Sequence, residues 1–194
     1  MMNLKNLFLR ALLALSIAVG APAALAGPMY RVSIDTSSLS GAGYLDLNLS
    51  GFSIATPARV TASNFSGDFL GDAASNGDVS GDILSGIQFG NSEVDNYFDQ
   101  AVSFGGLFSF DLSFDVVPAE AGIAFSVALL DAAMQSYLGG SVLLAIDLMP
   151  GEAPFLDVLQ PGLASVAEVP EPAHWLLLAT GLMLMAMTRR RYHS

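Results

Sequence analysis

The chain contains no cysteine, and its central part, residues 27–168, also contains no lysine, histidine or tryptophan. Without cysteine there is no disulfide framework and no thiolate chemistry. Without histidine and lysine, the central part cannot form Ser-His-Asp, Cys-His, zinc or Schiff-base sites. Carboxylates are therefore the groups left for acid–base or metal chemistry in this part of the chain.

Basic residues are almost absent from the same region. Residues 27–168 contain 17 acidic and two basic residues and carry a net charge of -15, whereas the whole chain of 194 residues carries -11. An acidic surface of this kind repels nucleic acid and anionic lipid and attracts cations. We expect no nucleic-acid partner, and the length fits one domain of ordinary size with terminal extensions.

Residues 1–26 have the pattern of a secretory signal peptide. A basic n-region precedes an apolar h-region at 11–19, and Ala24 and Ala26 form a small-x-small site that predicts cleavage before Gly27. The alternative is an uncleaved N-terminal anchor, but the apolar run is short for a membrane span. The pattern predicts export of everything that follows through the inner membrane.

The C-terminal region combines a Val-Pro-Glu-Pro stretch, an apolar run at 175–187 and an arginine cluster. A helix over the apolar run would be about 20 Å long, against a hydrocarbon core of about 30 Å. Arginine snorkelling and local thinning of the bilayer close part of this gap, and the arginines should stay in the cytoplasm. We therefore predict a short transmembrane helix that holds the exported body only for a time.

This order of segments resembles the PEP-CTERM sorting signal of Gram-negative bacteria. The resemblance implies that exosortase, a membrane-embedded cysteine transpeptidase, cuts the chain at the motif and passes the protein to the cell surface or the exopolysaccharide matrix. By resemblance, the sorting motif consists of Val169, Pro170, Glu171 and Pro172, and the membrane stop of Arg189, Arg190 and Arg191. The alternative is an ordinary, permanent single-pass anchor.

The exported body shows short runs in which apolar and polar residues alternate. The clearest is LFSFDLSFDVV at 107–117, in which Phe108, Phe110, Leu112 and Phe114 alternate with serine and aspartate. Such alternation predicts strands with one buried and one solvated face. Other runs of this kind lie at 29–35, 44–50, 59–65, 77–84, 122–131 and 141–149. Roughly eight strands separated by Gly, Ser, Asn and Asp predict an all-β protein, an antiparallel β-sandwich of jelly-roll type.

The expected division of the chain follows from these patterns. The signal peptide occupies 1–26, the exported β-sandwich domain 27–149, a linker 150–168 and the sorting signal 169–194. The linker is interrupted by proline and glycine, although PFLDVL within it is compatible with one further strand. A short helix at 129–140 is an open alternative to an extended conformation.

The body also resembles an extracellular β-domain that recurs among PEP-CTERM proteins. The segments that carry the resemblance are VSIDTSSLSGAGYLDLNL, VTASNFSGD, GDVSGDI, VDNYFDQAVSFGGLFSFDLSF and FSVALLD, which span most of 30–148. The resemblance implies an extracellular location and a β fold. It implies no catalytic residues.

Two acidic patterns are candidates for chemistry. In NSEVDNYFDQ, Glu93 with Asp95 or Asp99 is compatible with a glycoside hydrolase that uses paired carboxylates, since residues 93 and 95 would share a face of one strand. The simpler interpretation is a polar loop with Tyr97 and Phe98 buried beneath it. Four Gly-Asp pairs offer possible Ca²⁺ ligands, namely Asp68, Asp72, Asp78 and Asp82. Their spacing matches neither the EF-hand loop nor the nine-residue Gly-Asp repeats of calcium β-rolls, and turns explain them better.

These observations together predict an exported, non-catalytic protein that is processed by exosortase. We expect it at the cell surface or in the exopolysaccharide matrix, with a structural or adhesive role in biofilm or floc formation and no required cofactor. A carbohydrate- or calcium-binding surface module is the first alternative, and a glycoside hydrolase the second. The phenylalanines of 104–114 could stack on sugars, but their alternation favours a place in the core.

Overall fold

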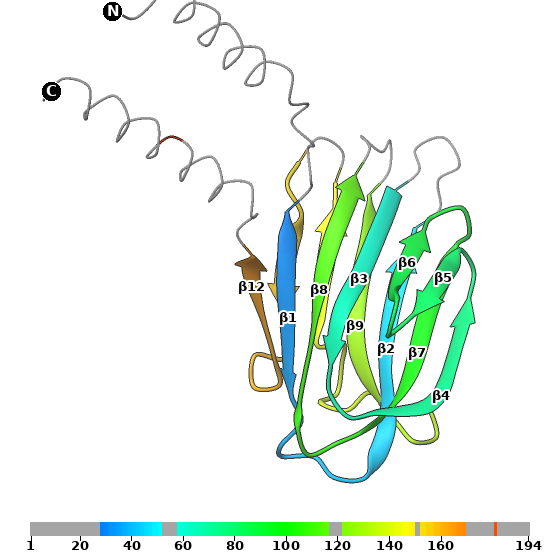
Figure 1. Cartoon of the computed structure of the whole chain (residues 1–194), viewed down its shortest axis with the longest axis vertical. Coiled ribbons are helices and arrows are strands. Elements are labelled where there is room, and N and C mark those ends of the chain that lie inside the picture. Colours follow the sequence, from blue (N-terminus) through cyan, green and yellow to red (C-terminus); the bar gives the residue numbers. More distant parts are fainter. Residues whose placement is uncertain (1–27, 52–57, 117–121, 150–151, 170–180, 182–194) are drawn as a thin grey trace, which may run out of the picture.

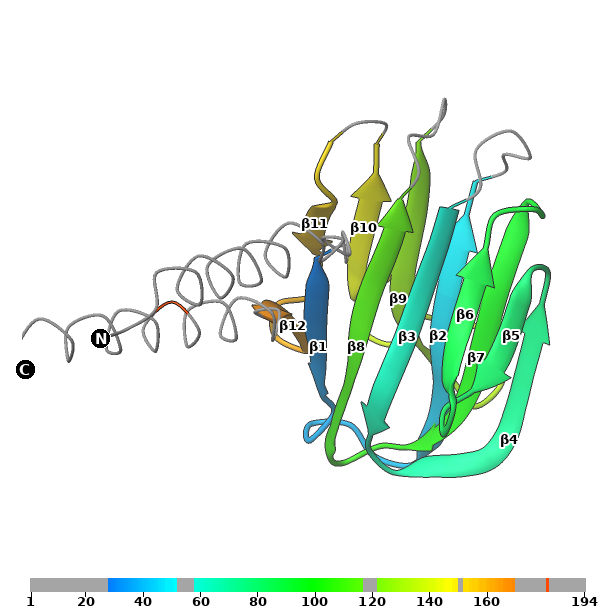
Figure 2. The same cartoon turned by 45° about the horizontal axis from the view of Figure 1, so that its top comes forward.

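The computed structural model describes residues 28–51, 58–116, 122–149 and 152–169, together with Gly181. The described residues form a β-sandwich, as predicted, in which two six-stranded antiparallel sheets pack face to face. Figures 1 and 2 show the two sheets as separate layers, whose longer strands run along the sandwich.

The first layer, sheet A, begins with the last strand of the chain beside the first. Its order is β12 (Ala164–Val169), β1 (Met29–Asp35), β8 (Leu107–Val116), β3 (Ala58–Ser66), β6 (Gly86–Gly90) and β5 (Val79–Asp82). Every neighbouring pair is antiparallel. The chain ends of the sandwich therefore meet at one edge of this sheet.

The second layer, sheet B, carries the candidate site described below. Its order is β11 (Phe155–Val158), β10 (Leu144–Leu148), β9 (Ile123–Asp131), β2 (Ala42–Ser50), β7 (Asp95–Ser103) and β4 (Phe69–Asn76). Strands β2, β7 and β9 form the middle of the sheet, with nine residues each. The outward side chains of these three strands are therefore held on the most extensively paired part of the sheet.

The core lies between the sheets and follows the alternation predicted from the sequence. On β8, Phe108, Phe110, Leu112 and Phe114 are buried, and Leu45, Leu47 and Leu49 of β2 face them from the other sheet. Phe89 of β6 and Phe125 of β9 meet across the interface with ring centroids 5.4 Å apart. Each fully buried side chain of this size contributes roughly 1.5–3 kcal/mol of transfer free energy. The phenylalanines of β8 thus belong to the core rather than to a sugar-binding surface.

Buried polar side chains form hydrogen bonds that hold the loops against the sheets. The hydroxyl of Thr36 donates to the carbonyl of Gly106 at 2.8 Å and accepts hydrogen bonds from the N–H groups of Gly105 and Gly106. Asn96 accepts from the N–H of Asp78 at 2.7 Å and donates to the carbonyl of Leu49 at 3.1 Å. These groups replace the hydrogen bonds that water would otherwise supply to buried polar atoms.

The strand count and the end of the sandwich differ from expectation. The described residues contain twelve strands rather than roughly eight, in part because β4, β6 and β7 lie outside the alternating runs expected to be strands; β4, for example, is exposed, carries little apolar alternation and still pairs at the edge of sheet B. The segment 150–168, expected to be a linker with one possible further strand at PFLDVL, contains that strand as β11 and also most of β12. The sandwich therefore extends beyond residue 149, to Val169.

The stretch 129–140 contains no helix. Residues 129–131 complete β9, and the rest forms turns in which Tyr137 bridges back to Leu130. The two glycines at 139–140 have φ near +90°, which ends any helical continuation. Its apolar residues therefore extend β9 and form a turn at the margin of the candidate site.

Candidate functional site

Two aspartates face each other at the centre of the outer face of sheet B. Asp46 of β2 is the direct partner of Asp99 of β7 in the antiparallel register. The same row continues with Ala128 of β9 beside Asp46 and with Ala74 of β4 beside Asp99. Since alanine is small, the row leaves space around the two carboxyl groups.

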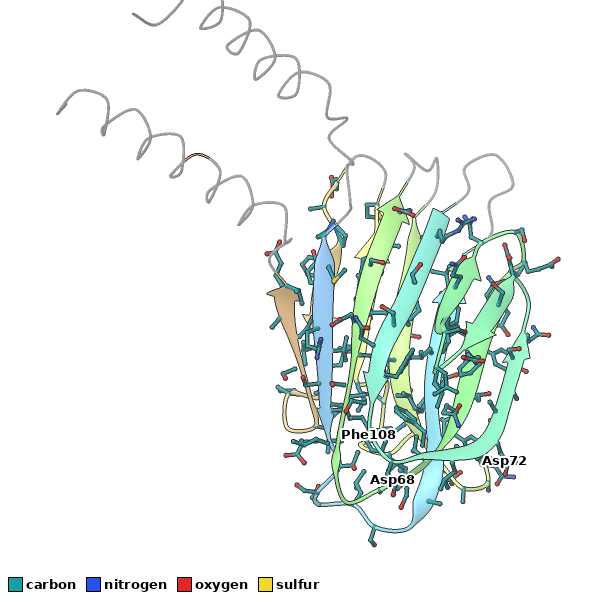
Figure 3. The ribbon with its side chains drawn as sticks, in the orientation of Figure 1. Asp68, Asp72 and Phe108 are labelled. Atoms are coloured by element: carbon teal, nitrogen blue, oxygen red, sulfur yellow. The ribbon has the colours of Figure 1, made fainter. Side chains whose placement is uncertain are left out.

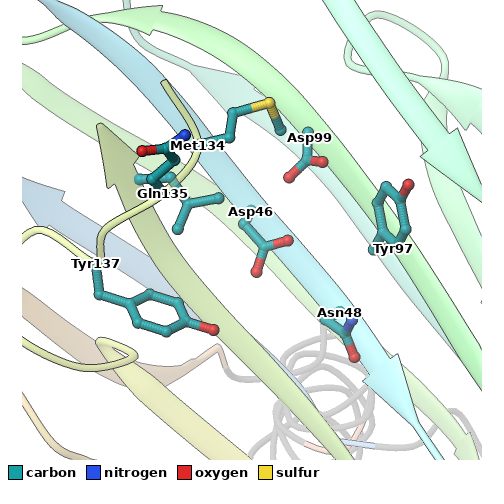
Figure 4. A pocket seen from close by; sticks show the side chains of 8 residues that line it. Asp46, Asn48, Tyr97, Asp99, Met134, Gln135 and Tyr137 are labelled. Carbon is teal, nitrogen blue, oxygen red and sulfur yellow. The ribbon is translucent and has the colours of Figure 1, made fainter. Parts of the chain in front are cut away.

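An open pocket of about 360 Å³ contains this pair. Its lining residues are Asp46, Asn48, Tyr97, Asp99, Leu130, Met134, Gln135 and Tyr137. In Figure 4, Tyr97 and Tyr137 lie on opposite sides of Asp46 and Asn48, and the side chain of Met134 extends toward Asp99. The floor of the pocket is thus provided by strands, and one wall by the turn that follows β9.

The electrostatic environment of the pair disfavours two full negative charges. Burial, the hydrogen bond with the carboxyl of Asp99 and the negative charges of Asp99 and Asp95 together raise the pKa of Asp46 to about 7. Burial also raises the pKa of Asp99, whose side chain is only 4% exposed. Oδ1 of Asp99 is buried, and no donor among the described residues reaches it. The pair therefore needs a proton or another positive charge.

Glu93 shares a strand face with neither of its predicted partners, Asp95 and Asp99. Strand β7 begins at Asp95, so Glu93 lies in the preceding bend and does not share a strand face with it. Both residues line a second open pocket of about 470 Å³ with Asn76 and Gly77, whereas Asp99 lies in the pocket of Asp46. The polar-loop interpretation is also wrong in part, because residues 95–100 are strand, although Phe98 is buried as expected.

The four Gly-Asp aspartates lie in or beside turns and an edge strand and do not form one group. Figure 3 shows Asp68 near the end of the sandwich at Phe108 and Asp72 farther along β4. Asp78 accepts hydrogen bonds from Ser92, and Asp82 accepts from the N–H groups of Leu84 and Ser85. Among the described residues, no group of three or more acidic, histidine or cysteine side chains is arranged to hold a metal ion. The turn interpretation fits these contacts.

The terminal predictions fall mostly outside the described residues. This holds for the signal-cleavage residues Ala24, Ala26 and Gly27, for the motif residues Pro170, Glu171 and Pro172, and for the membrane stop Arg189, Arg190 and Arg191. Val169 is described, as the last residue of β12. No helix among the described residues is long and apolar enough to cross a membrane, and of the span predicted at 175–187 only Gly181 is described.

Comparisons with protein-family models, with curated proteins and with solved structures found no match to this chain. The candidate site is therefore argued from its own geometry. Sequence reasoning missed Asp46 as a partner of Asp99. The alternation in YLDLNLS already placed Asp46 and Asn48 on the side opposite the leucines, but only the strand register brings Asp46 to Asp99.

Proposed function

We propose that this is an exported protein that exosortase processes at Val169–Pro172 and that acts at the cell surface or in the exopolysaccharide matrix. Its role there is structural or adhesive, in biofilm or floc formation, and not catalytic. The observation that carries the proposal is the order of the C-terminal segments, with the Pro-Glu-Pro motif, an apolar run too short for comfortable residence in a bilayer, and three arginines. Exosortase and the inner membrane are the partners before processing, and exopolysaccharide is the candidate partner afterwards.

The extent of the sandwich is compatible with two cleavages. All twelve described strands lie between Met29 and Val169, inside the two predicted cut positions. Removal of both terminal segments would therefore leave every described strand pair in place. A processing enzyme that discarded part of β12 would instead expose the edge of β1.

The sandwich is best interpreted as a jelly roll with additional strands. In a jelly roll, strands from the two halves of the chain pair in nested order, and here β1 pairs with β8, β2 with β7 and β3 with β6. Strands β9, β10 and β11 then extend sheet B, and β12 extends sheet A. Jelly rolls serve many unrelated functions, so this assignment by itself favours no activity.

The geometry of the carboxylates argues against a glycoside hydrolase. A retaining enzyme needs two carboxyl groups about 5–5.5 Å apart, so that the glycosidic bond lies between them. Asp46 and Asp99 are directly opposed residues of neighbouring strands, whose Cα atoms lie about 4.5–5.5 Å apart, which leaves no room for a sugar between their carboxyl groups. Glu93 is exposed in a bend, where nothing described holds it opposite a second carboxylate.

A second candidate is a carbohydrate-binding module on the same scaffold. It is favoured by the two tyrosines, Tyr97 and Tyr137, that flank the polar floor of the pocket, since aromatic faces combined with a few polar groups are typical of ligand sites. A glycan array with the full chain, followed by calorimetry of any positive ligand, tests this candidate. Tyr97→Ala and Tyr137→Ala should each abolish specific binding.

Mass spectrometry of the mature protein tests the primary proposal. In cells with active exosortase, the mature chain should end within or beside the motif and lack Trp175 and the arginines. Glu171→Ala should block this step, whereas Glu168→Ala, which changes an exposed acid of β12 three residues earlier, should not. A wild-type mature chain that still carries Trp175 would identify a permanently anchored protein instead.

A further inference from the structure

We propose that the Asp46–Asp99 pair is the binding site of a divalent cation and that Ca²⁺ is the ion it fits best. The inference rests on this pair and its pocket alone. Its test is therefore independent of the test of sorting by exosortase, because the two proposals concern different residues and different measurements.

The position of the two carboxyl groups suits a shared ion. They project from directly opposed residues of neighbouring strands into one pocket, on the most extensively paired part of sheet B. Oδ1 of Asp99 is buried without a donor among the described residues, although buried polar atoms are normally satisfied. A cation between the two carboxyls would supply the missing partner without any rearrangement of the strands.

The described residues of sheet B include no basic side chain. The two basic side chains among the described residues, Arg31 and Arg59, are both on sheet A. On sheet B, the charge of Asp95 adds to that of Asp99 in acting on Asp46. Close carboxylates that share a partly buried site cannot both stay ionised without compensation. In this pocket the compensation has to come from outside the described chain, as a proton or as a bound ion.

Neutral side chains with oxygen atoms line the pocket beside the pair. Asn48 donates its amide N–H to Asp95 at 2.9 Å, which leaves its carbonyl oxygen as an acceptor beside Asp46. Gln135 lines the same pocket from the turn after β9. Two carboxylates, amide oxygens and water suit Ca²⁺, which accepts six to eight oxygen ligands in irregular geometry, better than Mg²⁺, which requires a near-ideal octahedron.

The site would bind weakly. The described residues bring no third acidic, histidine or cysteine ligand to the pair, so water must complete the coordination shell. Extracellular modules with few charged ligands bind Ca²⁺ with dissociation constants of roughly 10⁻⁴–10⁻³ M. An affinity in this range is sufficient for Ca²⁺ binding by an extracellular module.

Thermal unfolding of the full chain, in chelator and in millimolar CaCl₂ at pH 7.5, tests the proposal. With Ca²⁺ at about ten times its dissociation constant, we expect the Tm to rise by about 3–6 °C. Asp46→Asn and Asp99→Asn should each lose the Tm shift, whereas Asp147→Asn, which changes an exposed aspartate of β10 outside the pocket, should keep it.

Terbium luminescence provides a readout that does not depend on the aspartate variants being folded. Tb³⁺ replaces Ca²⁺ in oxygen sites, and excitation of Tyr97 and Tyr137 should sensitise its emission, which excess Ca²⁺ should quench. The double variant Tyr97→Phe/Tyr137→Phe should lose most of this emission and keep the Ca²⁺-dependent Tm shift. The proposal is overturned by an unchanged Tm in wild-type protein, or by a shift that persists in both asparagine variants. A Tm shift produced by a neutral oligosaccharide in chelator, with none produced by Ca²⁺, would also overturn it and assign the pocket to sugar.

Discussion

Met29 and Val169 are directly opposed residues of the antiparallel pair β1 and β12. They are the first residue of the first strand and the last residue of the last strand. The predicted signal cleavage lies two residues before Met29, and the Pro-Glu-Pro motif begins immediately after Val169. The two predicted processing positions therefore lie at the same end of one strand pair, and no spacer separates β12 from the sorting motif.

The pairing of Met29 with Val169 predicts that a disulfide can join them. Opposed residues of antiparallel strands have Cα atoms about 4.5–5.5 Å apart, within the range that a disulfide spans. The double variant Met29→Cys/Val169→Cys introduces the only two cysteines of the chain. Because the bond closes a loop of roughly 140 residues, it should raise the free energy of unfolding by about 3–5 kcal/mol.

Urea unfolding of oxidised and reduced protein measures this gain, and a thiol assay checks that the bond has formed. The single variant Met29→Cys is the control and should respond to neither oxidant nor reductant. Two thiols that remain free in the oxidised, folded protein would contradict the register.

The Asp46–Asp99 pair predicts that, without Ca²⁺, stability falls as the pH rises toward neutrality. An acid with a higher pKa in the folded than in the unfolded state binds more protons when folded, so removing protons favours unfolding. The pKa of Asp46 is raised from 3.8 to about 7, chiefly by burial, so the loss should occur between about pH 4 and pH 7. It should reach at most about 4 kcal/mol.

Asp46→Asn should remove most of this pH dependence and should be more stable than wild type at pH 8 in chelator. Asp147→Asn, on the same sheet but outside the pocket, should keep the wild-type slope. Below about pH 4 the trend reverses, because turn hydrogen bonds lower the pKa of Asp35, Asp82 and Asp131 in the folded state. Parallel curves of urea midpoint against pH for wild type and Asp46→Asn would contradict the assignment to this pair.

The long alternating runs allowed the core to be predicted from the sequence. Phe110, Leu112 and Phe114 recur every second residue, and this period is that of an extended strand. Their burial on one face of a strand could therefore be predicted from the sequence. Strand β12 lacked this signal. Only Ala164 and Val166 of this strand belong to the core or pack against it, and its place in the sheet depends on pairing with β1, which is distant in sequence.

The candidate site could be predicted only in part, for a related reason. The outward direction of Asp46 follows from the alternation of its own strand. Its proximity to Asp99 depends on which strands are neighbours and in which register, and a shift of one residue would have placed it opposite Phe98 or Gln100 instead. Which carboxylates form a pair thus depends on the tertiary structure, whereas the face to which each of them points follows from the alternation of its own strand.

On sheet A, Arg31 and Asp111 form the ion pair that compensates a buried carboxylate. Nη2 of Arg31 donates to Oδ2 of Asp111 at 3.1 Å, Nε donates to Oδ1, and Asn64 donates to Oδ2 at 2.8 Å. Because the Arg31 side chain is 44% exposed, water can replace part of its interaction. Arg31→Ala should therefore cost about 1–3 kcal/mol rather than the larger penalty of a fully buried pair.

Urea unfolding at pH 7 measures this cost. Arg59→Ala, which removes the other described arginine from an exposed position of β3, should change the free energy of unfolding by less than about 0.5 kcal/mol. Adding Asp111→Asn to Arg31→Ala should recover part of the loss, because the amide carries no charge that needs a partner. A loss that is equal in the two arginine variants would show that the ion pair adds nothing specific.

Two glycines near the turn into β4 should respond in opposite ways to alanine. Gly67 has a φ of +152°, and a Cβ built on it would collide with the ring of Phe108, which is held in the core. Figure 3 shows Phe108 beside this end of the sandwich, near Asp68. Gly71 has no atom within 4 Å of its Cβ position, and its φ lies outside the left-handed region.

Gly67→Ala should therefore lower the free energy of unfolding by about 2–4 kcal/mol, through overpacking and backbone strain, whereas Gly71→Ala should stay within about 0.5 kcal/mol of wild type. The urea midpoints of the two variants test this prediction. Similar midpoints would mean that the turn adapts to the added methyl group, and that the contact of Gly67 with Phe108 does not fix how the chain passes from sheet A to sheet B.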